Sequence, residues 1–302
     1  MPPTSRNALR RVDTLTRDQI DSYLASYPAA LIAKASSSTS KSTLSGETLA
    51  ELDQWYQALP FLTTTTSISD SISTKTDLIK LVKWKLSREK HRPTLISLIS
   101  SNPAPICQQV LLRASTHLVT HSKHRSLQTS PTEELLKVVE ETMKILAELK
   151  GVGPATSSAI VASWIPWGVF QSDELVLNLN AGQGKIDYTW AFYRRFYGEA
   201  IEVVKKSMRD GKGLICGKDV ERVAWSMFHG PSAPDSLENV QGEDRTSGKV
   251  NDKTANKKIR EKVETLGKKE VKRKTPESMP KANPTDEDMQ ARRTSKRIRS
   301  KS

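Results

Sequence analysis

The chain has 302 residues, 36% of them hydrophobic, and it carries a formal net charge of +13 with a pI of about 9.6. This basic balance favours polyanionic partners, and it favours nucleic acid over anionic membrane because no basic helix with a bulky apolar face is evident. Two cysteines, Cys107 and Cys216, are too few and too far apart for a disulfide framework, a thiolate metal site or an iron–sulfur cluster.

The first predicted element is a short helix that begins at Thr16. Thr16 and Gln19 have the spacing of a capping box, and apolar residues follow them at helical intervals. The run 35–45 is rich in Ser, Thr and Lys, which is typical of a flexible linker. We therefore expect an N-terminal region, 1–45, that contains one helix and a linker.

Residues 46–230 contain nearly all of the aromatic side chains, and strand signals are almost absent from them. Apolar residues recur at helical spacing, which predicts one all-helical domain with an all-α fold, an orthogonal helical bundle. The predicted helices begin near residue 47 and continue at 77–87, 94–100, 106–119, 132–149, 154–163, 188–208 and 218–228.

The predicted helix at 77–87 and the loop after it are strongly basic. Lys83, Lys85, Arg88 and Arg92 form a compact patch that we predict to contact phosphates. Trp84 lies in the middle of this patch and could stack on a base, but its spacing from other apolar residues favours a place in the core.

Two glycines, Gly151 and Gly153, lie between the predicted helices 132–149 and 154–163. Glycine allows a positive φ and lets a phosphate approach the main chain, while Pro154 is suited to the first position of a helix whose free N–H groups attract an anion. The sequence thus predicts a helix-hairpin-helix at 135–165 that grips a nucleic-acid backbone. Its predicted contact residues are Gly151, Val152, Gly153, Ala155 and Thr156.

The segment Leu149 to Ala159 resembles the helix-hairpin-helix of DNA repair proteins, above all that of the base-excision DNA glycosylase superfamily, with its pattern Leu-x-Gly-Val-Gly-x-x-Thr-Ala. In that family a catalytic aspartate follows the hairpin by about twenty residues, and here Asp173 follows Gly151 by 22. The resemblance implies that the Asp173 carboxylate would stabilise positive charge on the sugar while a flipped base departs.

Other residues depart from the glycosylase pattern. Ala155 stands where members with lyase activity carry a lysine, so the resemblance implies a monofunctional hydrolase without strand cleavage. Ser172 and Glu174 flank Asp173 where the family has other residue types, and the three residues could instead cap the next helix. A group of uncharacterised eukaryotic proteins has a similar layout, with counterparts of Lys83 to Lys85, the hairpin and Ser172 to Glu174 in the same order. The chain resembles this group more closely than it resembles the glycosylases.

The C-terminal region, 231–302, has no Phe, Trp or Tyr and carries 19 basic and 12 acidic residues. It cannot bury enough apolar surface to fold, so we predict a disordered basic tail. Two basic clusters in this tail are typical of nuclear localisation signals. The first comprises Lys268, Lys269, Lys272, Arg273 and Lys274, and the second Arg292, Arg293, Lys296 and Arg297.

Three functional hypotheses follow from the sequence. The first is a nuclear protein that binds DNA through phosphate contacts, with little sequence specificity, in DNA repair. The second is a glycosylase-like hydrolase that uses Asp173, and the third is a protein-interaction scaffold without either activity. The choice between RNA and DNA stays open, although the hairpin is commoner on DNA. The histidines show no metal-ligand pattern, and no apolar stretch is long enough to span a bilayer, so we expect no metal, cofactor or membrane partner.

Overall fold

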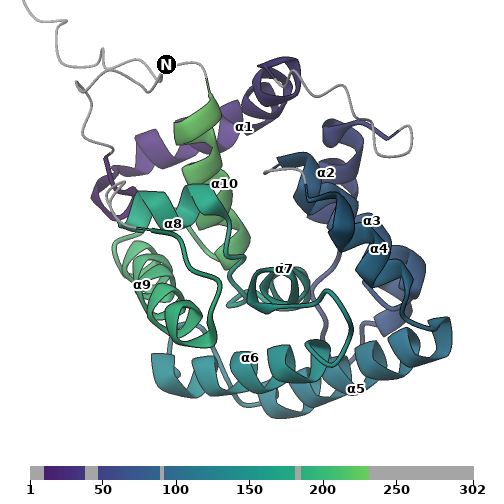
Figure 1. Ribbon diagram of the computed structural model, residues 1–302. Coiled ribbons are helices and arrows are strands. Elements are labelled where there is room, and N and C mark those ends of the chain that lie inside the picture. The colour runs from purple at the N-terminus through teal and green to yellow at the C-terminus, as the bar shows by residue number, and fades with distance from the viewer. Residues whose placement is uncertain (1–9, 38–46, 89–91, 181–184, 231–302) are drawn as a thin grey trace, which may run out of the picture. The chain divides into compact units, whose positions relative to one another are not determined.

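The computed structural model describes residues 10–37, 47–88, 92–180 and 185–230, and the regular structure within these ranges is helical throughout (Figure 1). The all-α prediction is confirmed for this part of the chain. Short 3-10 segments at Val12–Thr14 and Ile68–Asp70 accompany ten α-helices. These are α1 Arg17–Ser37, α2 Leu49–Ala58, α3 Lys75–Arg88, α4 Pro93–Ser100, α5 Ala104–Ser122, α6 Thr132–Leu146, α7 Pro154–Trp164, α8 Asp173–Leu179, α9 Trp190–Arg209 and α10 Gly217–His229.

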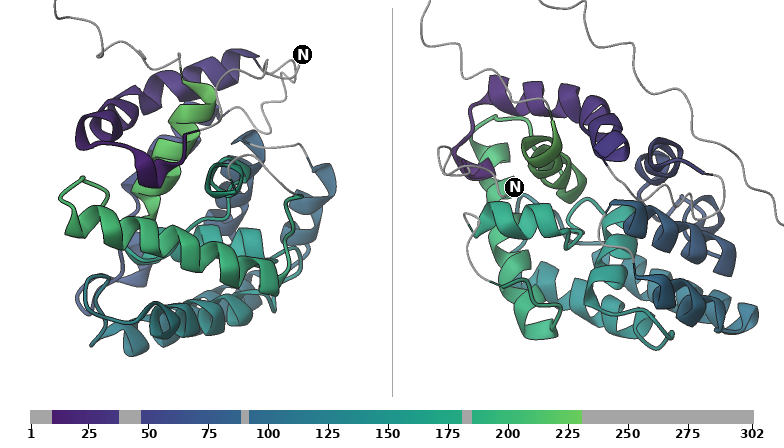
Figure 2. Two further views of the ribbon diagram at one scale, coloured as in Figure 1. Left: turned by 90° about the vertical axis from the view of Figure 1, so that its left-hand side faces the viewer. Right: turned by 45° about the horizontal axis from the view of Figure 1, so that its top comes forward.

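The N-terminal helix α1 is longer than predicted and continues to Ser37, into the run that we expected to be a linker. It crosses α10 and also contacts α2 (Figures 1 and 2). Tyr27, Ala30 and Leu31 are buried there against Trp225. The helix is therefore part of the same packed unit as the helices that follow it. The predicted basic tail and both of its clusters lie outside the described residues.

Helix α7 lies at the centre of this unit, between α3, α6 and α10 (Figure 1). Every residue of α7 after Pro154 is buried, and most of them are small or apolar. The hydroxyl groups of Ser158 and Ser163 donate to carbonyl oxygens of their own helix, and the Tyr56 hydroxyl donates to the Ala159 carbonyl at 2.8 Å. Such internal bonds allow polar residues in a helix that is packed on all sides.

The side chain of Arg88 is fully buried at the end of α3, although the sequence predicted that it contacts phosphate. Its guanidinium contacts two indole rings, 4.9 Å from the centroid of Trp84 and 4.0 Å from that of Trp225. The prediction for Arg88 is therefore wrong, because no solvent-facing surface is left for a DNA contact. The core assignment of Trp84 is confirmed, since this side chain is also fully buried.

Arg88 joins four helices through its polar contacts. The guanidinium pairs with Asp53 of α2 at 3.3 Å and with Glu221 of α10, and it donates to the Tyr27 hydroxyl of α1 at 3.0 Å. Asp53 also accepts hydrogen bonds from Tyr27 at 2.8 Å and from the Trp84 indole at 2.9 Å. A buried charge is tolerated only when it is paired and hydrogen-bonded in this way.

We expect Arg88→Met to lower the free energy of unfolding by about 3–5 kcal/mol, because it leaves two buried carboxylates without their cation. The matched control is Arg113→Met, which removes a half-exposed arginine from its pair with Glu148 and should cost less than about 1 kcal/mol. Urea denaturation of the full chain measures both changes. Similar small losses in the two variants would contradict the structural role of Arg88.

A second ion pair connects α6 and α9 at the surface. Arg194 donates two hydrogen bonds to the Glu140 carboxylate, at 2.6 and 2.8 Å, and Lys144 pairs with the same carboxylate at 2.7 Å. The hydrogen bonds from Arg194 lower the pKa of Glu140 to about 2. The interactions that lower this pKa stabilise the folded protein fully at pH values above 4.5, the pKa of the unfolded state. This stabilisation is lost as the pH falls toward 2.

Replacing Arg194 by methionine should therefore destabilise the protein at pH 7, and the difference from the unmodified chain should shrink as the pH falls from 4.5 toward 2. Denaturation curves at several pH values measure this difference. Arg195→Met is the control, because Arg195 makes no ion pair among the described residues. A destabilisation by Arg194→Met that does not change with pH would count against the pair.

Candidate nucleic-acid interface

The turn between α6 and α7 comprises residues 147–153. Gly151 has a φ of +81°, and a Cβ at this position would lie 3.2 Å from side-chain atoms of Leu98 and Ile99 in α4. Gly151 is thus required both by its backbone conformation and by the close approach of α4. Val152, which the sequence predicted as a contact residue, is buried in the core, whereas a Cβ on Gly153 would meet no atom within 4 Å. One side of the turn is therefore packed and the other is open.

Three backbone N–H groups on this turn and at the start of α7 donate no hydrogen bond to another described residue. They belong to Gly151, Gly153 and Ala155, whereas the amides of Val152 and Thr156 donate to carbonyl oxygens within the turn at 3.1 and 3.0 Å. Such unpaired donors at a helix N-terminus, together with the helix dipole, favour an anion. Here α7 begins at Pro154, which has no N–H, as the sequence predicted.

Asn102, in the connection between α4 and α5, fixes the turn in place. Its carboxamide oxygen accepts from the Lys150 amide at 2.9 Å, and its amino group donates to the Lys150 carbonyl at 3.0 Å and to the Ile99 carbonyl at 3.0 Å. The side chain is buried. The sequence analysis did not find this residue, because nothing local in the sequence links Asn102 to a turn 48 residues further along the chain.

The open side of the turn forms one wall of a groove with a volume of about 660 Å³. The groove is also lined by Lys85 near the end of α3, by the α4 N-cap Arg92 and by residues of α4. The groove thus brings together seven of the residues that the sequence predicted as DNA contacts, namely Lys85, Arg92, Gly151, Val152, Gly153, Ala155 and Thr156. Lys83 is on the same helix as Lys85 but does not line the groove.

The cations of the groove differ in exposure. Arg92 and Lys150 are exposed, and Lys150 was not among the predicted contacts. Lys85 is buried in the wall, with 4% of its surface exposed. Arg92 and Lys150 are therefore the side chains best placed to meet a phosphate in solution, with the backbone amides of the turn beside them.

Asp173 lies at the first position of α8, where Ser172 is the N-cap and accepts a hydrogen bond from the Leu175 amide at 3.3 Å. The expected helix cap is thus present. The Asp173 carboxylate accepts a hydrogen bond of 2.5 Å from the hydroxyl of Tyr188, which lines the groove. Arg92 lies over the Tyr188 ring at 5.2 Å. Asp173 therefore orients a side chain of the groove wall, and its catalytic role stays a prediction.

Two tryptophans that precede Asp173 in the sequence lie in the core. Trp164 and Trp167 are buried, so neither lines an open pocket. The rings of His117 and His121 are 4.4 Å apart, but within the described part of the chain no group of three or more His, Cys, Asp or Glu is arranged to hold a metal ion. None of the helices described is long and apolar enough to cross a membrane.

Comparison with known proteins adds no relative. No protein-family model matches the chain, and no curated protein or solved structure is significantly similar to it.

We expect Asn102→Ala to destabilise the protein by about 1–3 kcal/mol, because it removes a buried side chain that bonds both the Lys150 amide and the Lys150 carbonyl. Hydrogen exchange should be faster at the Lys150 amide in this variant. Ser101→Ala is the control, since the exposed Ser101 hydroxyl donates only to the Leu98 carbonyl of its own helix end. Unchanged exchange at Lys150 would show that Asn102 does not hold the turn.

Proposed function

We propose that the protein binds the phosphate backbone of DNA through the turn between α6 and α7, which would act as a helix-hairpin-helix. One observation carries this proposal: the free N–H groups of Gly151, Gly153 and Ala155 lie along a single open groove at a helix N-terminus. A phosphate oxygen is an acceptor of the size and charge that such donors favour.

The charges around the groove support an anionic ligand. Arg92 and Lys150 are exposed cations in its walls, and the acidic Glu148 is already paired with Arg113. The net charge of +13 would steer a polyanion toward the protein at long range. Contacts of this kind position a backbone and carry no sequence information, so we propose binding without base specificity.

The resemblance of the turn to DNA repair proteins supports DNA as the polyanion and repair as its context. The two basic clusters of the C-terminal region support import into the nucleus, where such a substrate is found. We leave hydrolysis out of the proposal, because the Asp173 carboxylate is engaged by Tyr188.

The variant Gly153→Asp tests the proposal, because it should change folding and binding in opposite directions. Gly153 is the N-cap of α7, where aspartate is a favoured residue, and the added side chain has open space. Its carboxylate can accept hydrogen bonds from the free N–H groups and take the place of a phosphate. We expect unchanged or slightly higher thermal stability, and affinity for a duplex that falls about tenfold or more.

The matched control is Gly198→Asp, which adds the same charge at an open position of α9 outside the groove. Both full-length variants are titrated with an undamaged duplex by fluorescence anisotropy over a salt series. Loss of one phosphate contact should also reduce the slope of the logarithm of the binding constant against the logarithm of the salt concentration by about 0.9, in Gly153→Asp alone. Equal affinity of the two variants would refute binding by the turn. Salt-independent binding, or none, would favour the scaffold hypothesis.

A further inference from the structure

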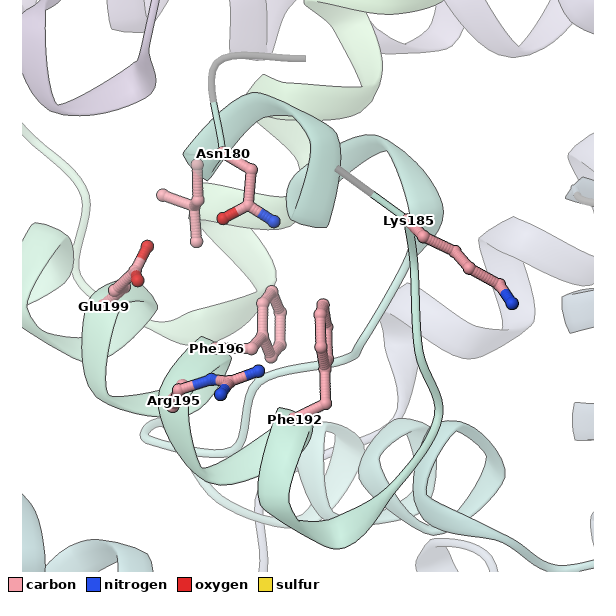
Figure 3. Close-up of a pocket in the computed structure, with 7 residues that line it drawn as sticks. Asn180, Lys185, Phe192, Arg195, Phe196 and Glu199 are labelled. Atoms are coloured by element: carbon pink, nitrogen blue, oxygen red, sulfur yellow. The ribbon is translucent and has the colours of Figure 1, made fainter. Parts of the chain in front are cut away.

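A second pocket lies between the end of α8 and the first half of α9, and it shares no residue with the groove (Figure 3). Its volume is about 440 Å³, which is within the range of sites that hold small organic molecules. The residues that line it include two aromatic rings, two cations, one carboxamide and one carboxylate. This mixture of groups defines the ligand that fits.

Two phenylalanines of α9 supply the apolar part of the pocket. Phe196 is buried and Phe192 is partly buried, and both rings line the cavity beneath Asn180 (Figure 3). The neighbouring Tyr193 and Tyr197 are buried in the core, so they do not compete for this space. An aromatic ring at the edge of an open cavity provides a surface on which a flat ring system stacks.

Three polar side chains of the pocket make no ion pair and no side-chain hydrogen bond with another described residue. The Arg195 guanidinium lies over the Phe192 ring at 5.8 Å but makes no ion pair in that part of the chain. The Asn180 carboxamide points toward the two rings in Figure 3, and neither it nor the Glu199 carboxylate has a side-chain hydrogen bond with another described residue. The pocket therefore offers a cation, an amide and a carboxylate together with an aromatic surface.

We propose that this pocket binds a purine nucleotide, either free or as an unpaired residue of a strand. The base stacks on Phe192, and the carboxamide of Asn180 donates and accepts at the base edge, the pairing by which asparagine recognises adenine. Arg195 pairs with the phosphate, and Glu199 accepts a hydrogen bond from the sugar. A purely apolar ligand would leave the polar groups unused, and a simple anion would leave the rings unused. This site does not depend on DNA binding by the turn.

The first experiment measures binding of three probes to the full chain by isothermal titration calorimetry. The probes are AMP, ribose 5-phosphate, which lacks the base, and adenosine, which lacks the phosphate. We expect AMP to bind saturably and the other two to bind at least about tenfold more weakly, because each loses one set of contacts. Ribose 5-phosphate that binds as tightly as AMP would overturn the proposal, as would an absence of AMP binding.

Variants then assign AMP binding to this pocket. Arg195→Gln and Phe192→Leu should each weaken AMP binding about tenfold. Arg209→Gln removes the same charge from an exposed position of α9 outside the pocket and should leave AMP binding unchanged. Unchanged affinity in both pocket variants would place AMP elsewhere, for example on the basic C-terminal region, and refute the site.

Two further measurements distinguish a free nucleotide from an unpaired strand, and binding by the pocket from binding by the turn. A hexamer of deoxyadenosine that binds more tightly than AMP, and loses affinity in both pocket variants, identifies an unpaired strand; binding of AMP alone identifies a free nucleotide. Gly153→Asp should leave AMP binding intact. Loss of duplex binding in that variant with AMP binding retained shows that each site functions without the other.

Discussion

The buried guanidinium of Arg88 is the interaction on which the arrangement of the helices depends. A charge without solvent is stable only if several partners surround it, and these partners come from α1, α2 and α10. The indole rings of Trp84 and Trp225 lie against the guanidinium and help to exclude water from it. The C-terminal end of α3 is thereby fixed, and with it the position of Lys85, one turn earlier, in the wall of the groove.

The same buried cluster reaches the start of α8. Burial raises the pKa of Glu221 to about 7, against the lowering by the Arg88 charge, and the nearby charges of Glu174 and Asp53 add to the rise. Glu174 in turn accepts a hydrogen bond from His229 at 2.9 Å. Asp53 and Glu221 thus share one guanidinium in the interior, and Glu174 pairs with His229 nearby. The helix that carries Asp173 is consequently held from inside the protein, while Tyr188 holds the Asp173 carboxylate at the groove.

Local signals explain how much of this protein could be predicted from its sequence. The turn at Gly151 was predictable because a positive φ, a buried valine and a proline at the first helical position are all encoded within a few residues. The core position of Trp84 followed from helical periodicity. Such patterns depend only on neighbours along the chain, so they also predicted most of the helices.

Residues whose role depends on distant partners could not be predicted in this way. Arg88 is basic and follows two lysines, which is the pattern of a solvated patch, yet its carboxylate partner in α10 is 133 residues away. Asn102 resembles an ordinary loop residue until its contact with Lys150 is seen. The start of α9 was also placed too early, because Tyr188 is held by Asp173 and the N-cap is Thr189.

The free donors of the α6–α7 turn belong to the main chain, and this has a consequence for how the surface tolerates change over evolutionary time. A ligand held by backbone amides is indifferent to most side chains around it, so the turn can drift in composition while its shape persists. Selection for such binding would be concentrated at positions that determine the path of the backbone. In this protein those positions are Gly151 and the distant Asn102.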